Sequence, residues 1–206
     1  MTAGLREQRK QQTKQNISDV ATAMFIKRGF DAVTIAEIAE AAGVAKMTVT
    51  NYFPRKEDLV FDRADAIVAS LAHAIAGRAA GESMLAAIRH DYERRIETSD
   101  AGLGMSSPLF ARLVTSSPVL ASRGREIMDQ RERALSDAIA AEAGHPSVQQ
   151  HIIAVQLASV HRVLGEEATL RSLTGEPPDQ IRAALSADAK EAFDRLEPSL
   201  GDYGVR

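Results

Sequence analysis

Residues 34–56 read TIAEIAEAAGVAKMTVTNYFPRK, and this stretch decides the fold. Thr34 occupies a helix N-cap position, and Glu37 stands three residues later, which is the spacing of a capping box. Gly43 stands where the first helix must end in a sharp turn. A second short helix follows and ends in aromatic residues beside a basic loop. Two short helices around a four-residue turn, the second with a polar and basic outer face, are typical of the helix-turn-helix that reads DNA.

The second helix supplies the candidate DNA contacts. Its apolar positions Val44, Val49 and Phe53 are predicted to point inward, which leaves the other side chains outward. Lys46 suits a phosphate or a guanine edge, and Asn51 can bind adenine in a bidentate way. The outward positions predicted to contact DNA are Lys46, Met47, Thr48, Thr50, Asn51 and Tyr52. Two alternatives stay open: a corner of this shape that never touches DNA, and Tyr52 as a core aromatic.

Residues 29–60 resemble the amino-terminal domain of the TetR family of transcriptional regulators. The resemblance covers roughly residues 10–60 and rests on features that agree in order and spacing: Gly29-Phe30, the Thr34 cap, Gly43-Val44, Asn51-Tyr52-Phe53 and Lys56-Glu57-Asp58-Leu59. It implies that Thr34, Tyr52 and Lys56 contact the phosphate backbone. Met47 stands where the family often has a small residue and Thr50 where it often has tyrosine, so the base preference stays open.

The amino-terminal flank is predicted to complete a three-helix head. An amphipathic helix from about Lys10 to Arg28 carries apolar residues at helical spacing, and residues 1–9 are expected to form a frayed arm. Residues 1–30 carry six basic and two acidic side chains, a net +4, so the rest of this −3 chain carries −7. A basic end on an acidic body suits one end that faces phosphate, although a charged terminus is also ordinary.

The rest of the chain predicts an all-α fold, with a DNA-binding domain over residues 1–54 and a helical body over 55–206. Helical periodicity and Pro or Gly breaks divide the body into successive helices. We expect helices at 55–77, 85–96, 108–114, 118–143, 147–173 and 179–196, with a loop over 99–107. The helix over 147–173 is apolar on more than one face, so it is expected to be buried on two sides.

Nothing in the sequence predicts an enzyme, a metal site or a cofactor. The chain has no cysteine, and its five histidines are never three or four residues apart. No P-loop, nucleophile elbow or zinc-protease motif occurs. No apolar run approaches the ~20 residues that span a bilayer, and no signal peptide begins the chain, so a cytoplasmic protein is expected.

The body is predicted to hold a small, mainly apolar effector. The candidate lining residues are Met84, Ile88, Tyr92, Met105, Phe110, Arg112, Leu113, Val155 and His161. Arg112 could receive an anionic group of that ligand. For each of these residues, ordinary core packing or solvation is the alternative. Residues 106–135 are also similar to the body of actinobacterial regulators that sense acyl-CoA-type ligands.

These features together predict a homodimeric repressor. Two heads, about 34 Å apart, would bind a near-palindromic operator on double-stranded DNA. Helices 147–173 and 179–196 would form the dimer as a four-helix bundle. An effector would release the DNA by changing the separation of the heads through the helix at 55–77. The alternatives are a constitutive regulator without an effector, and a helical ligand-binding or enzymatic bundle with a vestigial head.

Overall fold

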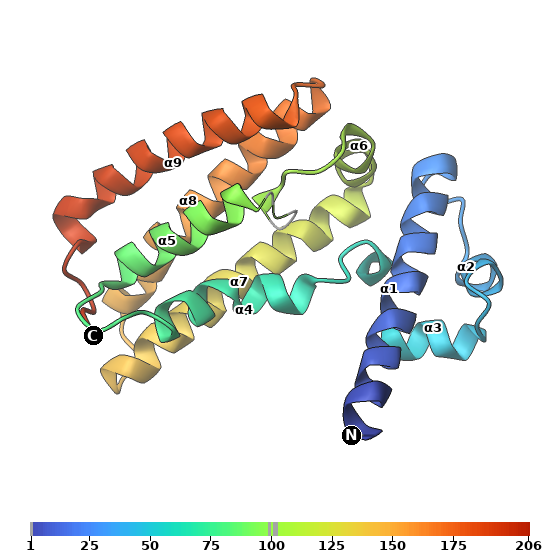
Figure 1. Ribbon diagram of the computed structural model, residues 1–206, viewed down its shortest axis with the longest axis horizontal. Helices are drawn as coiled ribbons and strands as arrows, with labels where there is room; N and C mark the ends of the chain where they lie inside the picture. The colour runs from blue at the N-terminus through green and yellow to red at the C-terminus, as the bar shows by residue number, and fades with distance from the viewer. Residues whose placement is uncertain (1, 99, 101–102) are drawn as a thin grey trace. The chain divides into compact units, whose positions relative to one another are not determined.

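The computed structural model describes residues 2–98, 100 and 103–206, and every regular element in these ranges is a helix (Figure 1). This confirms the all-α class. The elements are α1 (Thr2–Arg28), α2 (Ile35–Ala41), α3 (Lys46–Tyr52), the 3₁₀ turn η1 (Lys56–Leu59), α4 (Ala64–Ala76), α5 (Met84–Glu97), α6 (Pro108–Ser116), α7 (Pro118–Ala143), α8 (Val148–Leu173) and α9 (Pro178–Leu200).

The chain divides into two compact units. The first contains the chain up to Ala64 together with Arg112–Gly124, and the second contains Asp65–Ala111 and Arg125–Arg206. Helices α1, α2 and α3 build the first unit (Figure 1). The predicted division of function at residues 54 and 55 stays a prediction.

The core of the first unit forms where α1 packs against α2 and η1. Phe25 of α1 is fully buried, and its ring lies 5.0 Å from that of Phe30, which fixes the loop after α1. Ser18 Oγ donates a hydrogen bond to the Leu59 carbonyl at 2.8 Å. Since Ser18 is buried, this bond gives a core hydroxyl its partner and joins α1 to η1.

Two predicted boundaries in the amino-terminal part were wrong. The first helix begins at Thr2 and includes the segment expected to be frayed, where Glu7 lies near Lys10 (4.0 Å) and Gln11 (3.4 Å). The predicted helix at 55–77 is interrupted, because η1 turns Leu59 and Val60 into the core before α4 begins at Ala64.

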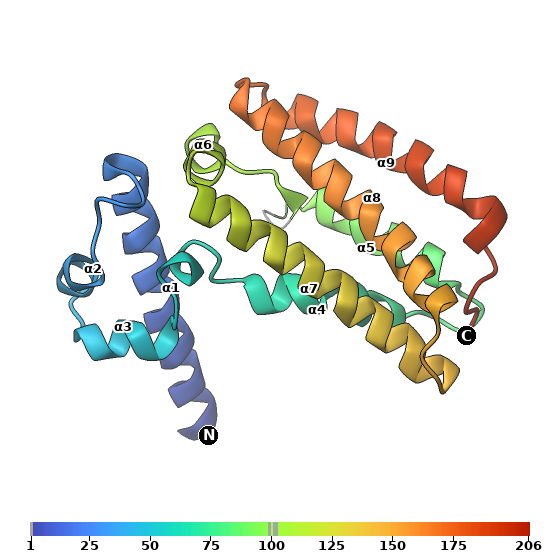
Figure 2. The same ribbon diagram turned by 180° about the vertical axis from the view of Figure 1, so that it is seen from behind.

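The second unit is a helical body in which α8 packs on α9, and α5 packs on both (Figures 1 and 2). Its core is built mainly from aliphatic side chains, as the low aromatic content predicted, with Tyr92 and Phe193 as large buried rings. Helix α7 runs without a break through Gly124, and Gly144 ends it with φ of +81°. The predicted loop at 99–107 includes residues 99, 101 and 102, which lie outside the described residues.

Helix α8 has two apolar faces. One is buried and includes Leu157 and Leu164. The other carries five large apolar side chains that are exposed in the single chain, and we call them the α8 stripe: Val148, Ile152, Val155, Val163 and Leu170. Their spacing places them on one side of the helix. The sequence therefore predicted the second apolar face correctly, but its expected burial stays a prediction, because nothing in the described part of the chain covers it.

Candidate DNA interface

The amino end of α2 is held by a complete capping box. Thr34 Oγ1 accepts the Glu37 N–H at 3.3 Å, while the Glu37 carboxylate accepts the Thr34 N–H and hydroxyl, both at 2.8 Å. Arg28 Nη2 at the end of α1 lies 2.7 Å from the other oxygen of Glu37. These bonds, the backbone bond first, lower the pKa of Glu37 from 4.5 to about 2. The cap therefore fixes both the start of α2 and its place against α1.

The turn between α2 and α3 depends on Gly43. Its φ is +67°, and the Val44 N–H reaches back to the Ala39 carbonyl at 2.9 Å. A Cβ at Gly43 would meet nothing within 4 Å, so the left-handed backbone, and not a lack of space, favours glycine here. The Schellman-like turn that results directs the chain into α3.

Helix α3 presents the outer face that the sequence predicted. Val49 and Phe53 are buried at 0% and 2% exposure, and they anchor the helix to the core. Met47 is 69% exposed, and Lys46, Thr50 and Asn51 are also exposed, whereas Thr48 and Tyr52 are half-buried. The Thr50 hydroxyl donates to the Met47 carbonyl at 3.1 Å, so part of its hydrogen-bonding capacity is used within the helix. That these side chains contact DNA stays a prediction.

Lys56 has partners inside the head. Its ammonium donates to the Phe30 carbonyl at 2.5 Å and lies 4.5 Å and 5.5 Å from the ring centroids of Phe30 and Phe25. Burial lowers its pKa. The structure therefore gives this predicted phosphate contact a structural role, which the sequence did not indicate.

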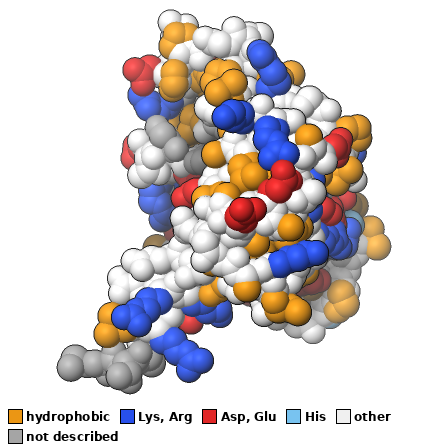
Figure 3. Space-filling view, turned by 90° about the vertical axis from the view of Figure 1, so that its right-hand side faces the viewer, with side chains coloured by type: hydrophobic (Ala, Val, Ile, Leu, Met, Phe, Trp, Pro, Cys, Tyr) orange, Lys and Arg blue, Asp and Glu red, His pale blue; other side chains and the backbone are white. Residues whose placement is uncertain are grey.

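Basic side chains lie along α1 of the head. The described part of α1 has exposed Arg6, Arg9 and Lys10 in its first turns. Lysine and arginine side chains lie near the beginning of α1 on the face shown at the lower left of Figure 3. Lys14 is oriented differently, because its Nζ donates to the Asp62 carbonyl at 3.0 Å and joins α1 to the segment after η1.

The predicted lining residues of the body fall into four groups. Four are buried in the second unit: Met84, Ile88, Tyr92 and His161. The others lie elsewhere: Met105 and Phe110 are half-buried, Arg112 and Leu113 belong to the first unit, and Val155 is 37% exposed on the α8 stripe. The structure brings together Tyr92 and His161, whose rings meet edge to face at 4.9 Å. It does not place Val155 in the core, because that position faces outward.

Sequence reasoning missed the charged groups beside this aromatic pair, among them Arg131 on α7 and Arg95 on α5. Arg131 is 2% exposed, and it stands among apolar positions at four-residue spacing. That interruption of an apolar stripe by an arginine was visible in the sequence. Within the described ranges, no group of histidine and acidic side chains could hold a metal ion. No described helix is long and apolar enough to cross a membrane.

A capped helix-turn-helix with an exposed polar reading helix, followed by a helical body, defines the class of DNA-binding transcriptional regulators. Within this class, the head of the chain is similar to the TetR family. Residues 17–62 match the family model described as "Bacterial regulatory proteins, tetR family". The family consists of regulators and not of enzymes.

The comparisons extend this relationship over the whole chain. The HTH-type transcriptional regulator TcmR of Streptomyces glaucescens is 27% identical over 208 residues, which cover 96% of this chain and 88% of the relative. A TetR-family transcriptional regulator from Mesorhizobium loti has a similar fold, with a TM-score of 0.58 at 19% identity, covering 91% of this chain and 96% of that one.

Two similar structures contain ligands. The SmeT–triclosan complex has a TM-score of 0.57 at 16% identity and covers 94% of both chains. FadR from Bacillus subtilis in complex with stearoyl-CoA has a TM-score of 0.51 at 19% identity, covering 88% of this chain and 96% of that one. At these identities the likeness concerns the fold alone.

Proposed function

We propose that this regulator is a homodimeric repressor that leaves a near-palindromic operator when a small ligand binds its body. The observation that carries the DNA-binding part is α3, which is anchored by Val49 and Phe53 and exposes Lys46, Met47 and Asn51. An exposed polar face on a rigidly seated short helix suits insertion into the major groove. Lys46 would bind phosphate or guanine, and Asn51 would read adenine.

The α8 stripe supports the homodimer. Five exposed apolar side chains on one side of a helix are more than scattered surface residues, and such a surface marks an interface. A second copy is the occupant that we propose, because α8, which carries the stripe, packs beside α9 (Figure 2). The same two helices from each copy would then meet around a two-fold axis as a four-helix bundle.

The ligand-responsive part is supported by polar groups within the body core that lack hydrogen-bond partners, including Tyr92 and His161. These groups favour an effector over a constitutive regulator, because a ligand would provide the missing partners. Triclosan and the acyl chain of stearoyl-CoA, held by the two similar structures, are apolar, and a mainly apolar ligand fits the aliphatic core here. Such a regulator acts in the cytoplasm, where the chromosome lies.

Selection of bound fragments from a random DNA pool tests this function. We expect a consensus of two inverted half-sites whose centres lie about one helical turn, 10–10.5 base pairs, or a multiple of it apart. A consensus of one half-site would contradict the dimer. Failure of the purified chain to retard any duplex at low ionic strength would contradict DNA binding altogether.

A further inference from the structure

An arginine occupies a core position of α7. The buried stripe of this helix in the second unit consists of Ile127, Arg131, Leu135 and Ile139, each four residues from the next. Their exposures are 1%, 2%, 0% and 1%. The pattern of the helix calls for an aliphatic side chain at position 131, so the guanidinium there requires an explanation.

Arg131 forms no direct ion pair in the described part of the chain, although the charge of Asp91 attracts it. Its Nε is buried and makes no hydrogen bond, and no described carboxylate lies within ion-pair distance. Burial, with the charge of Arg95, lowers the pKa of Arg131 to about 10 against the opposing effect of Asp91, so the group is still cationic at neutral pH. A buried cation without a counter-ion is costly, and an occupied site would contain an anion beside it.

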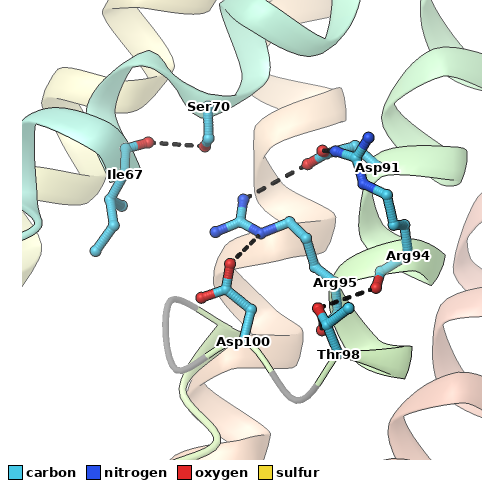
Figure 4. Close-up of polar contacts among 7 residues, drawn as sticks. All are labelled: Ile67, Ser70, Asp91, Arg94, Arg95, Thr98 and Asp100. Atoms are coloured by element: carbon cyan, nitrogen blue, oxygen red, sulfur yellow. Dashed lines mark hydrogen bonds and ion pairs between the residues drawn. The ribbon is translucent and has the colours of Figure 1, made fainter.

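The nearby acids are already engaged by other arginines. Asp91 pairs with Arg94 and lies 3.5 Å from Arg95, while Asp100 Oδ2 accepts from Arg95 Nε at 3.2 Å (Figure 4). Arg94, Arg95 and Arg131 therefore share two carboxylates, of which neither pairs directly with Arg131, so positive charge is in excess here. Asp91 Oδ2 makes no hydrogen bond, which offers an acceptor to a donor on a ligand.

An aromatic group with unsatisfied polar atoms stands beside these charges. His161 is 3% exposed, and its ring lies 4.9 Å from Tyr92 and 6.4 Å from Phe193. Neither nitrogen of His161 nor the hydroxyl of Tyr92 makes a hydrogen bond. Burial lowers the pKa of His161 well below its usual value, and the charges of Arg131 and Arg95 lower it further, against the opposing effect of the Ile88 backbone. His161 is thus neutral, with one donor and one acceptor to offer.

We propose that the body binds a small organic acid whose oxyanion pairs with Arg131 and whose apolar part packs among Tyr92, His161 and the aliphatic core. A guanidinium matches a carboxylate in geometry and charge, so the acid supplies what Arg131 lacks. His161 and Tyr92 select ligands with hydroxyl or carbonyl groups near the acid. This inference rests on the proposed ligand-responsive function and gives that ligand a chemical class.

Paired probes test the charge requirement. The full-length protein is heated without DNA in the presence of millimolar 2-naphthoate, salicylate or octanoate, and in parallel with the corresponding primary amides. We expect at least one acid to raise the melting temperature by roughly 2–5 °C, and its amide to leave it unchanged, because the amide lacks the charge. Comparison of salicylate with octanoate shows whether the apolar part of the ligand is aromatic or aliphatic. If no acid exceeds its amide, the proposal is wrong.

Variants locate the site. Arg131→Met should bind the responding acid roughly 10–100-fold more weakly by titration calorimetry, since it loses a charge-assisted contact. Its melting temperature without ligand should equal or exceed that of the wild type, because an unpaired buried charge has been removed. Arg131→Lys, which keeps the charge, should retain the preference for acid over amide. The matched control Arg133→Met, on the exposed side of α7, should change neither quantity.

The contrary results are equally definite. Undiminished acid binding by Arg131→Met would overturn the proposal. A second set of results would also overturn it: a lower melting temperature of Arg131→Met together with full acid binding by both Arg131→Met and Arg131→Lys. Arg131 would then be a structural residue only. These assays contain no DNA, so failure of the chain to bind DNA would contradict the proposed function without affecting the acid-binding result. Failure to bind an acid would likewise leave DNA binding unaffected.

Discussion

Two lysines of the head, ten positions apart, illustrate how the surroundings of a single residue decide its role. Lys46 extends from an exposed position of α3, whereas Lys56 is held by the Phe30 carbonyl and two aromatic rings. Their side chains are chemically identical. Their substitution should therefore affect different properties, Lys46 the binding of DNA and Lys56 the stability of the head.

Alanine at each position separates these roles. Lys56→Ala should reduce the free energy of unfolding by about 1–2 kcal/mol, because it removes a hydrogen bond and a cation–π contact. Lys46→Ala should leave stability unchanged, weaken DNA binding and reduce the slope of log K against log salt by about one. Chemical denaturation and fluorescence anisotropy at several salt concentrations measure both. Equal stability of the two variants would contradict the structural role of Lys56.

Glu37 makes the stability of the head depend on pH. Its pKa is about 2 when folded and 4.5 in the absence of the fold, so the carboxylate stabilises the folded state above about pH 4.5. This contribution is lost as pH falls from there towards 2, because the folded state must also take up the proton. The stability difference between the wild type and Glu37→Gln should thus be largest at neutral pH and shrink over that window. A constant difference between pH 7 and pH 3 would show that charge is not involved.

Much of the head was predictable because it depends on residues close together in the sequence. Contacts between residues far apart in the sequence were not predictable. The Thr34 and Glu37 cap and the Gly43 turn involve residues within a few positions of each other, so the sequence contains their whole cause. The position of the Lys56 side chain depends on Phe25 and Phe30, about 30 positions away, and becomes evident only after folding. Arg131 is a related case, since the sequence shows an arginine in an apolar stripe but not which charges surround it after folding.

At the scale of the element, periodicity predicted the helices well and their ends less well. The apolar repeats of α5, α7 and α8 placed these helices within a few residues of their observed bounds. The predicted helix at 55–77 failed, because Leu59 and Val60 fit a helical repeat but are buried in the head core instead. A periodic pattern records which residues are buried, and not which core buries them.

The α8 stripe gives the prediction at this scale. Val163→Glu places a charge within the proposed dimer contact and should raise the dimer dissociation constant at least about 100-fold, measured by analytical ultracentrifugation. Val163 is 51% exposed, so the melting temperature of the monomer should change little. Ala141→Glu adds the same charge at an exposed position of α7, outside the stripe, and should leave the dimer intact. A dimeric Val163→Glu would place the interface elsewhere.

At the scale of the whole molecule, the positive charge is concentrated at one end of the chain. The first 30 residues have a net charge of +4 and the remainder −7, so the attraction to phosphate is concentrated at the amino end. A single head of this size contacts few base pairs. Affinity for an operator therefore depends on two heads bound together, and the dimer converts the second contact into an intramolecular one.

This dependence can be measured by changing the DNA while the protein stays the same. Insertion of five base pairs between the selected half-sites turns one of them by about half a helical turn, which places it on the opposite face of the duplex. A dimer should then lose at least about 100-fold in affinity, since the second contact is lost. Val163→Glu, which binds as a monomer, should start from the weaker affinity and be insensitive to the insertion. If the wild type tolerates the insertion as well as the variant does, its heads bind DNA independently. Dimerisation through α8 would then not be the source of its affinity for the operator.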